Sequence, residues 1–477
     1  MCKTTNAANV TRVIESESFM TSPNRFFGGP TKDFFVSMLT RDIALDDAIL
    51  DLVDNSVDGA MRTRQDQRGT EQMYAGCQCR LTISGTTFEI SDNCGGIPKA
   101  YLENAFRLGR PKIDLDKGIP TIGVYGIGMK RAIFKIASEA TVESHSADAA
   151  VRVTYTGDWM ASEDDWYVPF TELGKDATLG VKITAVTIRP EISSKFTDPG
   201  FLDGLETQIA EHFAYLMKMG FEIFLNEKKI NPRIVQVVDG GAGSVRPYDY
   251  EGVTDGVKMK VTIGFYRKLT REAELEEATQ EGDQPVDKAG ITLICNERVI
   301  LHSDKTNQTG WGVASTPRYH PQFRAISGIV SFESDDASKL PVSTTKRDIE
   351  HSSALYIKAL NRCMDGIQIF TSFTNKWKGR EAETDQYLQE EKFTSARTVA
   401  LANSEGTVVR GSGGAEKVFT PELPKPPTKT TLRRIAFSRE TSEIEQLGLA
   451  LLDNARALPG DVGLAAWTRA LKEVGKP

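Results

Sequence analysis

The sequence predicts an α+β protein that is divided into several domains. A length of 477 residues corresponds to about two to four domains of ordinary size. Segments with helical periodicity alternate with short runs typical of strands from residue 31 onward. A stretch rich in glycine and proline then separates this body from a short helical pattern at the C-terminal end.

Composition narrows the function classes. Hydrophobic residues make up 40% of the chain, enough to fill real cores, so the chain is not wholly disordered. The net charge of −7 argues against a protein that coats nucleic acid by charge alone, but it does not exclude a local basic groove. Six scattered cysteines predict neither a disulfide framework nor a zinc site. No apolar run approaches the roughly 18 residues that span a bilayer, and no signal peptide is recognisable, so we expect a cytoplasmic protein without a membrane partner.

The first expected elements are a polar N-terminal arm over 1–30 and a first domain over 31–199. Helical patterning begins at Thr31, whose hydroxyl suits an N-cap, and continues to about Arg64. The later elements of this domain are strands at 80–84, 87–91, 140–144, 151–156 and 181–188 and a helix at 129–137.

A second domain is expected over 200–400. Its elements are helices at 201–218 and 348–374 and strands at 221–225, 257–265, 290–295 and 326–332. The acidic, apolar-poor segment 270–287 predicts a loop. Residues 401–430 are rich in glycine and proline and predict a linker, because such a composition cannot build a core. We expect a small helical module over 431–477.

Three polar side chains share one face of the helix expected at 47–62, DAILDLVDNSVDGAMR. At 100° per residue, Asp51, Asn55 and Asp58 point in directions within roughly 60° of one another, and apolar residues occupy the opposite side. In isolation the pattern fits a solvated amphipathic helix. It also fits a site in which Asn55 holds a metal ion and Asp51 polarises a water molecule.

Another carboxylate ends the second expected strand, in the segment FEISDNCGGIP at 88–98. Asp92 leads into a turn with Gly95 and Gly96, and glycine lets a ligand approach the backbone closely. A carboxylate in this place can accept a hydrogen bond from an exocyclic amine such as that of adenine. The alternative is an Asx-type turn without a ligand.

A glycine-rich loop, TIGVYGIGMKRA at 121–132, leads into the next expected helix. Gly126 and Gly128 precede the helix and Lys130 lies in its first turn. Backbone N–H groups at a helix N-terminus bind anions, so this loop suits a phosphate. The loop is not a Walker loop, because the pattern G-x-x-x-x-G-K-[ST] is absent.

In this order, the three segments resemble the motifs of the GHKL ATPases, which include gyrase B-type topoisomerase subunits, heat-shock chaperones, histidine kinases and MutL. DLVDNSVDGA resembles the N-box of that superfamily, DNCGGI its adenine-binding motif and GVYGIGMK its phosphate lid. The resemblance implies a Bergerat-type α/β sandwich ATPase domain over 31–199 with ATP and Mg²⁺ as cofactors.

The resemblance also implies a role for each matching residue. Asn55 is implied to be the magnesium ligand, Asp51 the general base and Asp92 the carboxylate that recognises adenine. The other implied nucleotide contacts are Gly96 in the adenine turn, Asp58 in the pocket wall, Gly126, Gly128 and Lys130 in the phosphate lid, and Thr184 in the strand-like ITAVTI. The match at Thr184 is the weakest, because Ile183 stands where the family has a glycine.

Two departures from the family pattern bear on activity. The general base is usually a glutamate, and Asp51 is one methylene shorter, so we expect slow hydrolysis. Cys94 replaces the first glycine after Asp92 and brings a thiol close to the site.

The second domain resembles the transducer domain that follows the ATPase domain in MutL, gyrase B and MORC proteins. The resemblance rests on FEIFLNEKKINP at 221–232 and AGITLICNERVIL at 289–301. STTK at 343–346 resembles the loop whose lysine reaches the γ-phosphate, which implies a catalytic role for Lys346; an ordinary surface lysine is the alternative. The YGIGMK lid looks closest to that of MORC-like bacterial ATPases.

These resemblances imply an ATP-dependent molecular switch. ATP is expected to order the lid, dock Lys346 and bring two copies together as a homodimer, which hydrolysis then releases. The expected target is DNA or a DNA-acting protein such as a nuclease. The likeness to bacterial MORC-like proteins implies a role in phage defence.

Three alternatives stay open. A chaperone-like ATPase that acts on a protein partner would need a dimerisation module, and the segment after the linker is short. A histidine kinase would need a phosphoacceptor histidine ahead of the ATPase domain, where 1–30 has none. A nucleotide-binding regulator would bind ATP without hydrolysing it.

Overall fold

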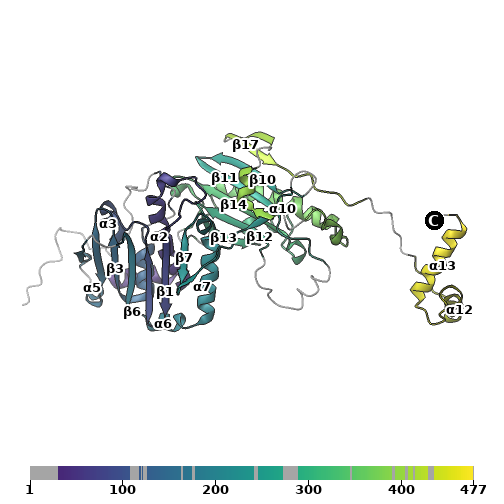
Figure 1. Ribbon diagram of the computed structural model, residues 1–477, viewed down its shortest axis with the longest axis horizontal. Helices are drawn as coiled ribbons and strands as arrows, with labels where there is room; N and C mark the ends of the chain where they lie inside the picture. Colours follow the sequence, from purple (N-terminus) through teal and green to yellow (C-terminus); the bar gives the residue numbers. More distant parts are fainter. Residues whose placement is uncertain are drawn as a thin grey trace, which may run out of the picture. The chain divides into compact units, whose positions relative to one another are not determined.

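The computed structural model divides into a large unit that ends at Pro424 and a small unit that begins at Lys425. It describes residues 31–107, 118–119, 121, 126–162, 165–174, 178–240, 245–271, 288–343, 346, 348–388, 393–402, 407–411, 414–427 and 435–475. The expected N-terminal arm at 1–30 and most of the expected loop at 270–287 therefore lie outside the described residues. Helices and strands alternate as predicted, so the α+β class is confirmed (Figure 1).

The first domain is built on an eight-stranded sheet with the order β5-β4-β3-β6-β2-β1-β7-β8. Its strands are β1 (Gln78–Ser84), β2 (Thr87–Asp92), β3 (Ala137–His145), β4 (Ala150–Tyr155), β5 (Phe170–Glu172), β6 (Gly180–Ile188), β7 (Glu222–Leu225) and β8 (Lys228–Lys229). Its helices are α1 (Lys32–Arg41), α2 (Leu45–Thr63), α3 (Lys99–Phe106), α4 (Gly128–Ile136), α5 (Gly157–Ala161), α6 (Pro190–Phe196), α7 (Pro199–His212) and α8 (Ala214–Lys218). Thr31 caps α1 as predicted, since its hydroxyl accepts the N–H of Phe34.

Strand alternation decides which side chains face the helices. In β1, Cys79, Leu81 and Ile83 are buried, and the residues between them are half-buried or exposed. The buried set packs against the apolar faces of α2 and α4 in one core. The polar face of α2 is thereby left to line a cavity.

The first domain extends beyond its predicted end at residue 199. β7 pairs in parallel with β1, and the first core continues to Ile230. The segment 221–232, which resembles part of a transducer domain, therefore belongs to the first sheet. The physical reason is the burial of two apolar side chains, Ile223 and Leu225. When β7 pairs with the edge of β1, these side chains enter the first core.

The second domain has a seven-stranded sheet with the order β13-β12-β14-β11-β10-β17-β16. Its strands are β10 (Tyr248–Thr254), β11 (Val257–Phe265), β12 (Gly290–Cys295), β13 (Arg298–Asp304), β14 (Ile326–Glu333), β16 (Thr407–Gly411) and β17 (Gly414–Phe419). The helix α10 (Ala354–Lys376) packs on this sheet, with the rings of Phe265 and Phe370 4.9 Å apart. A separate pair of strands, β9 (Gln236–Val238) and β15 (Phe393–Ser395), lies beside α11 (Ala396–Ala402).

Short 3-10 helices complete the large unit. They are η1 (Gln65–Gln67), η2 (Asn307–Thr309), η3 (Pro321–Phe323), η4 (Ala337–Lys339) and η5 (Glu381–Thr384).

A small apolar cluster joins the two domains, with Tyr215 from α8 packed among residues that include Val299 of β13 and Ile329 of β14. The two domains thus meet through a buried contact between α8 and the second sheet.

The linker predicted over 401–430 is partly wrong. Its residues 407–411 and 414–419 form a hairpin, and β17 pairs with β10 at the edge of the second sheet. Glu416 is buried there and forms an ion pair with Lys358 at 2.6 Å. The composition of 401–430 does not indicate this hairpin, because its partners, β10 and α10, lie far away in the sequence.

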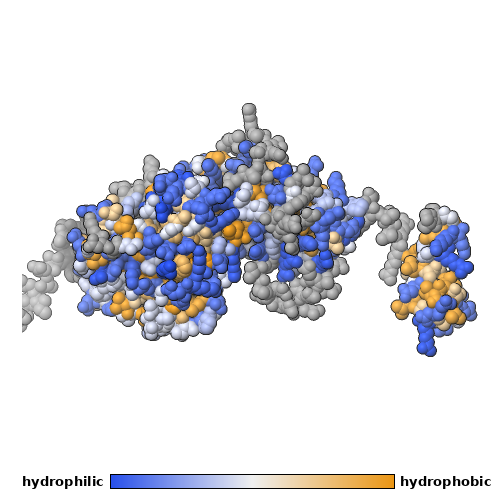
Figure 2. Space-filling view, in the orientation of Figure 1, coloured by the Kyte–Doolittle hydropathy of each residue, from blue (hydrophilic) through white to orange (hydrophobic). Residues whose placement is uncertain are grey.

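The described residues of the small unit form the helices α12 (Thr441–Leu452) and α13 (Pro459–Glu473). Asp453 ends α12 in the left-handed conformation with φ 51°. Val462 is buried, whereas several large apolar side chains of this unit are exposed, and Figure 2 shows them on its surface. In neither unit does a described helix have the length and apolar character needed to cross a membrane.

Candidate functional site

A cavity in the large unit is lined by residues of α2, α3, α4, β2 and β6. Every site residue predicted from the sequence except Thr184 lines it: Asp51, Asn55, Asp58, Asp92, Gly96, Gly126, Gly128, Lys130 and Lys346. Residues from four separate parts of the chain therefore meet at one place.

The acidic face of α2 forms one wall of the cavity. Asp51 and Asp58 are each 4% exposed, whereas Asn55, one turn from each, is exposed. Ile49, Val53 and Val57 on the other side are fully buried in the core. The helical spacing predicts that Asp51, Asn55 and Asp58 share one face, and in the structure all three line the cavity.

Asp92 lies at the end of β2 and is fixed by three donors. Its Oδ2 accepts the Ser56 hydroxyl at 2.8 Å, and its Oδ1 accepts the backbone N–H groups of Cys94 at 2.9 Å and Val181 at 3.2 Å. Burial raises the pKa of Asp92, although these donors favour the charged form. No sequence pattern indicates Ser56, a buried residue of α2 whose hydroxyl holds the carboxylate in place.

Replacing Asp92 with asparagine is expected to weaken ATP binding by about 1.5–3 kcal/mol for each charge-assisted hydrogen bond lost. The amide keeps the size of the carboxylate, but it lacks the charge and turns one acceptor into a donor. Calorimetric titration with ATP measures the difference. An unchanged affinity would remove Asp92 from the adenine site.

The raised pKa of Asp92 also predicts a dependence on pH. The charged carboxylate accepts a hydrogen bond from an amine, so affinity for ATP should fall as pH drops toward this pKa, earlier than for an ordinary aspartate. Affinity measured at a series of pH values checks this expectation. In the Asp92→Asn variant the same series should lose that acidic component; if it persists there, another group causes it.

Gly96 permits the turn that follows Asp92. Its φ is +70°, and a Cβ atom at this position would lie 2.1 Å from the carbonyl oxygen of His145. Any other residue would therefore force the turn away from the end of β3. This close approach keeps the backbone of the turn at the edge of the cavity.

Thr184 does not line the cavity. It pairs with Glu89 of β2 and Thr141 of β3. Alternation along β6 turns Val181 and Ile183 toward the cavity, so Thr184 faces the opposite side of the sheet. Val181, three residues earlier in β6, reaches Asp92 through its backbone N–H.

Asp51 is bound to a cation within the protein. Its Oδ2 accepts a hydrogen bond from Arg131 Nη2 of α4 at 2.6 Å, and both side chains are nearly buried. Gly128 gives room for this approach, since a Cβ there would lie 3.3 Å from Asp51 Oδ2. Within the described part of the chain, the buried Nε of Arg131 has no hydrogen-bond partner.

Lys130 is turned into the protein from the start of α4. Its Nζ donates to the carbonyl oxygens of Ala105 and Arg107, each at 2.7 Å, at the C-terminal end of α3. Burial lowers its pKa to about 8. Lys130 therefore ties α3 to the glycine-rich segment, while its neighbours Gly126 and Gly128 present backbone to the cavity.

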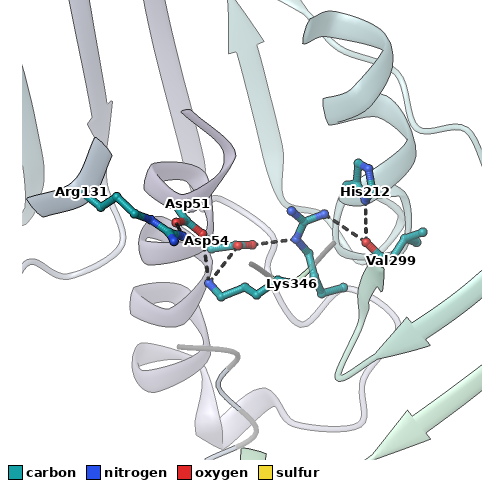
Figure 3. Close-up of polar contacts among 7 residues, drawn as sticks. Asp51, Asp54, Arg131, His212, Val299 and Lys346 are labelled. Atoms are coloured by element: carbon teal, nitrogen blue, oxygen red, sulfur yellow. Dashed lines mark hydrogen bonds and ion pairs between the residues drawn. The ribbon is translucent and has the colours of Figure 1, made fainter. Parts of the chain in front are cut away.

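Lys346 of the second domain reaches into the first (Figure 3). Its Nζ lies 3.0 Å from Asp54 Oδ2 and 3.7 Å from Asp51 Oδ1, and its side chain is only 12% exposed. Burial would lower the pKa of Lys346, but Asp54, Asp51 and Asp58 raise it. Burial would likewise raise the pKa of Asp54, but Arg298 and Lys346 lower it. No sequence pattern indicates Asp54 or Arg298 as part of the site.

The thiol of Cys94 is buried beside a second thiol. A hydrogen bond with Cys77, together with burial, raises the pKa of Cys94. The same hydrogen bond lowers the pKa of Cys77, and Arg64, whose Nε lies 3.4 Å from Cys77 Sγ, acts in the same direction against the effect of burial. The thiolate of Cys94 is therefore disfavoured, and the residue packs as a small apolar side chain.

The donor set of the cavity fits Mg²⁺ bound together with a phosphate. Mg²⁺ prefers oxygen ligands and usually takes one or two from the protein, with phosphates and water completing its shell. Asn55 offers an exposed amide oxygen between two acids. Among the described residues, no cluster of three or more His, Cys, Asp and Glu side chains could hold a metal ion without such help.

Part of the chain is similar to a known protein family. Residues 43–179 match the family model described as histidine kinase-, DNA gyrase B-, and HSP90-like ATPase. The match begins just before α2 and ends just before β6, so it contains the acidic helix face, Asp92 and the glycine-rich segment. A comparison with curated proteins found no match.

Proposed function

We propose that this chain, whose residues 43–179 form an ATPase domain of the histidine kinase-, DNA gyrase B- and HSP90-like type, binds ATP with Mg²⁺ in the cavity and hydrolyses it slowly. The main support is the way in which the Asp92 carboxylate is held at the cavity wall. Three donors hold its carboxylate at the wall of a cavity that also contains an acidic helix face and a lysine.

Each residue then has a chemical task. Asp92 accepts the exocyclic amine of adenine, and the backbone at Gly96 lets the base approach. Asn55 would hold Mg²⁺, which would neutralise charge on the phosphates. Asp51 accepts a proton from the attacking water, and Lys346 donates to the terminal phosphate.

The attachment of Lys346 to the second domain supports a switch. Only a triphosphate offers the terminal group that this lysine recognises, so ATP and ADP should differ in how firmly they join the two domains. We propose that ATP closes a homodimer through this coupling and that hydrolysis opens it. The lid's resemblance to MORC-like bacterial ATPases supports DNA, or a DNA-acting protein such as a nuclease, as the target and phage defence as the setting.

One observation favours a second candidate, a regulator that binds ATP without hydrolysing it. Arg131 occupies one oxygen of Asp51 at 2.6 Å, which leaves this carboxylate fewer free acceptor positions for an attacking water. The shorter side chain of aspartate adds to this effect, because a misplacement of about 1 Å can cost about 100-fold in rate.

Phosphate release and sedimentation together separate these candidates. A slow ATPase switch should release phosphate over many turnovers and form dimers with a non-hydrolysable ATP analogue but not with ADP. A regulator should dimerise with ATP itself and release no phosphate. A chain that stays monomeric with every nucleotide would contradict the dimer proposal.

A further inference from the structure

Two cations of the second domain converge on one buried carboxylate of the first. Arg298 Nε at the start of β13 donates to Asp54 Oδ1 at 2.7 Å, and Lys346 Nζ donates to Asp54 Oδ2 at 3.0 Å (Figure 3). The side chains of Asp54 and Arg298 are each 1% exposed. Asp54 does not line the cavity, whereas its partner Lys346 does, so Lys346 connects Asp54 directly to a ligand in the cavity.

Arg298 is itself firmly held. Its Nη1 donates to the carbonyl oxygen of Val299 at 3.2 Å, and its guanidinium lies 4.2 Å from the ring centre of Phe213. His212 Nδ1 lies 2.6 Å from the same carbonyl oxygen. These contacts give the guanidinium one orientation, and its fixed geometry in turn orients Asp54.

Lys346, by contrast, ends in a single ammonium group, and among the described residues its ion-pair partners are the carboxylates of Asp54 and Asp51. Its backbone has a φ of +56°, and a lysine side chain is a long flexible chain with a single charged end. Asp54 is the nearer carboxylate at 3.0 Å, and Asp51 is at 3.7 Å. An ammonium group has three donors, so Asp54 can hold it while another donor points to a phosphate.

We propose that Asp54 and Arg298 are positioning residues that hold the ammonium group of Lys346 in the cavity and so link the second domain to the recognition of a third phosphate. This inference rests on the proposed ATP-binding function. It adds two residues, one from each domain, to a contact that would otherwise depend on a single lysine.

Asp54→Asn tests the proposal, because asparagine keeps the size of aspartate and an oxygen for Arg298 but loses the charge that holds Lys346. The expected result is a loss of about tenfold or more in affinity for a non-hydrolysable ATP analogue, with ADP affinity within about twofold of wild type. Calorimetry on the full chain measures both. Asp335→Asn is the matched control, since Asp335 pairs with Arg68 across the same two domains at an exposed position and should leave both affinities unchanged.

A double-mutant cycle separates positioning from general damage. If Asp54 acts through Lys346, then Asp54→Asn should have no further effect on analogue affinity in a Lys346→Ala background. Arg298→Lys keeps the charge but loses the fixed geometry, and it should give a smaller loss that also disappears in that background. This second variant provides the test if Asp54→Asn does not fold.

Two outcomes would overturn the inference while the proposed function stands. One is an equal loss of ADP and analogue affinity in Asp54→Asn. The other is an undiminished loss in the Lys346→Ala background. If the wild-type chain binds neither nucleotide, the proposed function fails and the inference fails with it.

Discussion

Replacing Asp51 with asparagine is expected to reduce ATP hydrolysis by about 100- to 10,000-fold, the usual contribution of a positioned general base. Affinity for ATP should change little, because Asp51 acts on the water rather than on the nucleotide. Asparagine retains an oxygen that can accept from Arg131, which pairs with Asp51 at 2.6 Å, so the buried guanidinium keeps a partner. Alanine should abolish hydrolysis as well, with an added loss of stability. Steady-state phosphate release and calorimetry measure the two effects.

Two further variants sharpen this prediction. Asp51→Glu should preserve or raise the rate, because its extra methylene carries the carboxylate further into the cavity. Asp66→Asn changes an exposed acid outside the cavity and should leave the rate unchanged. If Asp51→Asn hydrolyses ATP at the wild-type rate, the base lies elsewhere.

Replacing Lys346 with alanine is expected to weaken binding of a non-hydrolysable ATP analogue on the order of 10- to 100-fold, the range for one or more charge-assisted hydrogen bonds. ADP affinity should stay nearly unchanged, because ADP lacks the terminal phosphate. Asp54 would keep Arg298 as a partner, at 2.7 Å, so the variant leaves no isolated buried charge at that position. Sedimentation should show less dimer with the analogue than for wild type.

Lys339→Ala is the matched control for this experiment. Lys339 belongs to the same domain but is exposed, and its Nζ donates to a backbone oxygen, that of Asp255. Its loss should affect neither nucleotide affinity nor dimerisation. If Lys346→Ala dimerises with the analogue as wild type does, the assignment of Lys346 to the terminal phosphate is wrong, although the ATPase domain itself is untouched.

The parts of the site that sequence predicts are those set by local geometry. A helix repeats every 3.6 residues, so Asp51, Asn55 and Asp58 must share a face wherever α2 lies. The turn after Asp92 is likewise local, because Gly96 is needed to let the backbone pass close to β3. These patterns identify the cavity wall before any tertiary contact is known.

The parts that sequence does not predict depend on distant pairing. Asp54 and Arg298 are separated by 244 positions, and neither belongs to a pattern that indicates the other. Thr184 fails for another reason, since it lies next to Ile183 in β6 and strand alternation turns neighbouring side chains to opposite faces of the sheet. The hairpin of β16 and β17 depends on the edge of β10, which composition cannot show.

Calorimetric titration of the full chain with ATP and with GTP in the presence of Mg²⁺ tests directly whether Asp92 forms an adenine-specific ATP site. We expect saturable binding of ATP that is tighter than that of GTP, because guanine presents a carbonyl oxygen to the Asp92 carboxylate where adenine presents an amine. Asp92→Asn should lose most of that preference. Equal binding of the two nucleotides, or a preference for ATP that survives Asp92→Asn, would show that Asp92 does not recognise adenine.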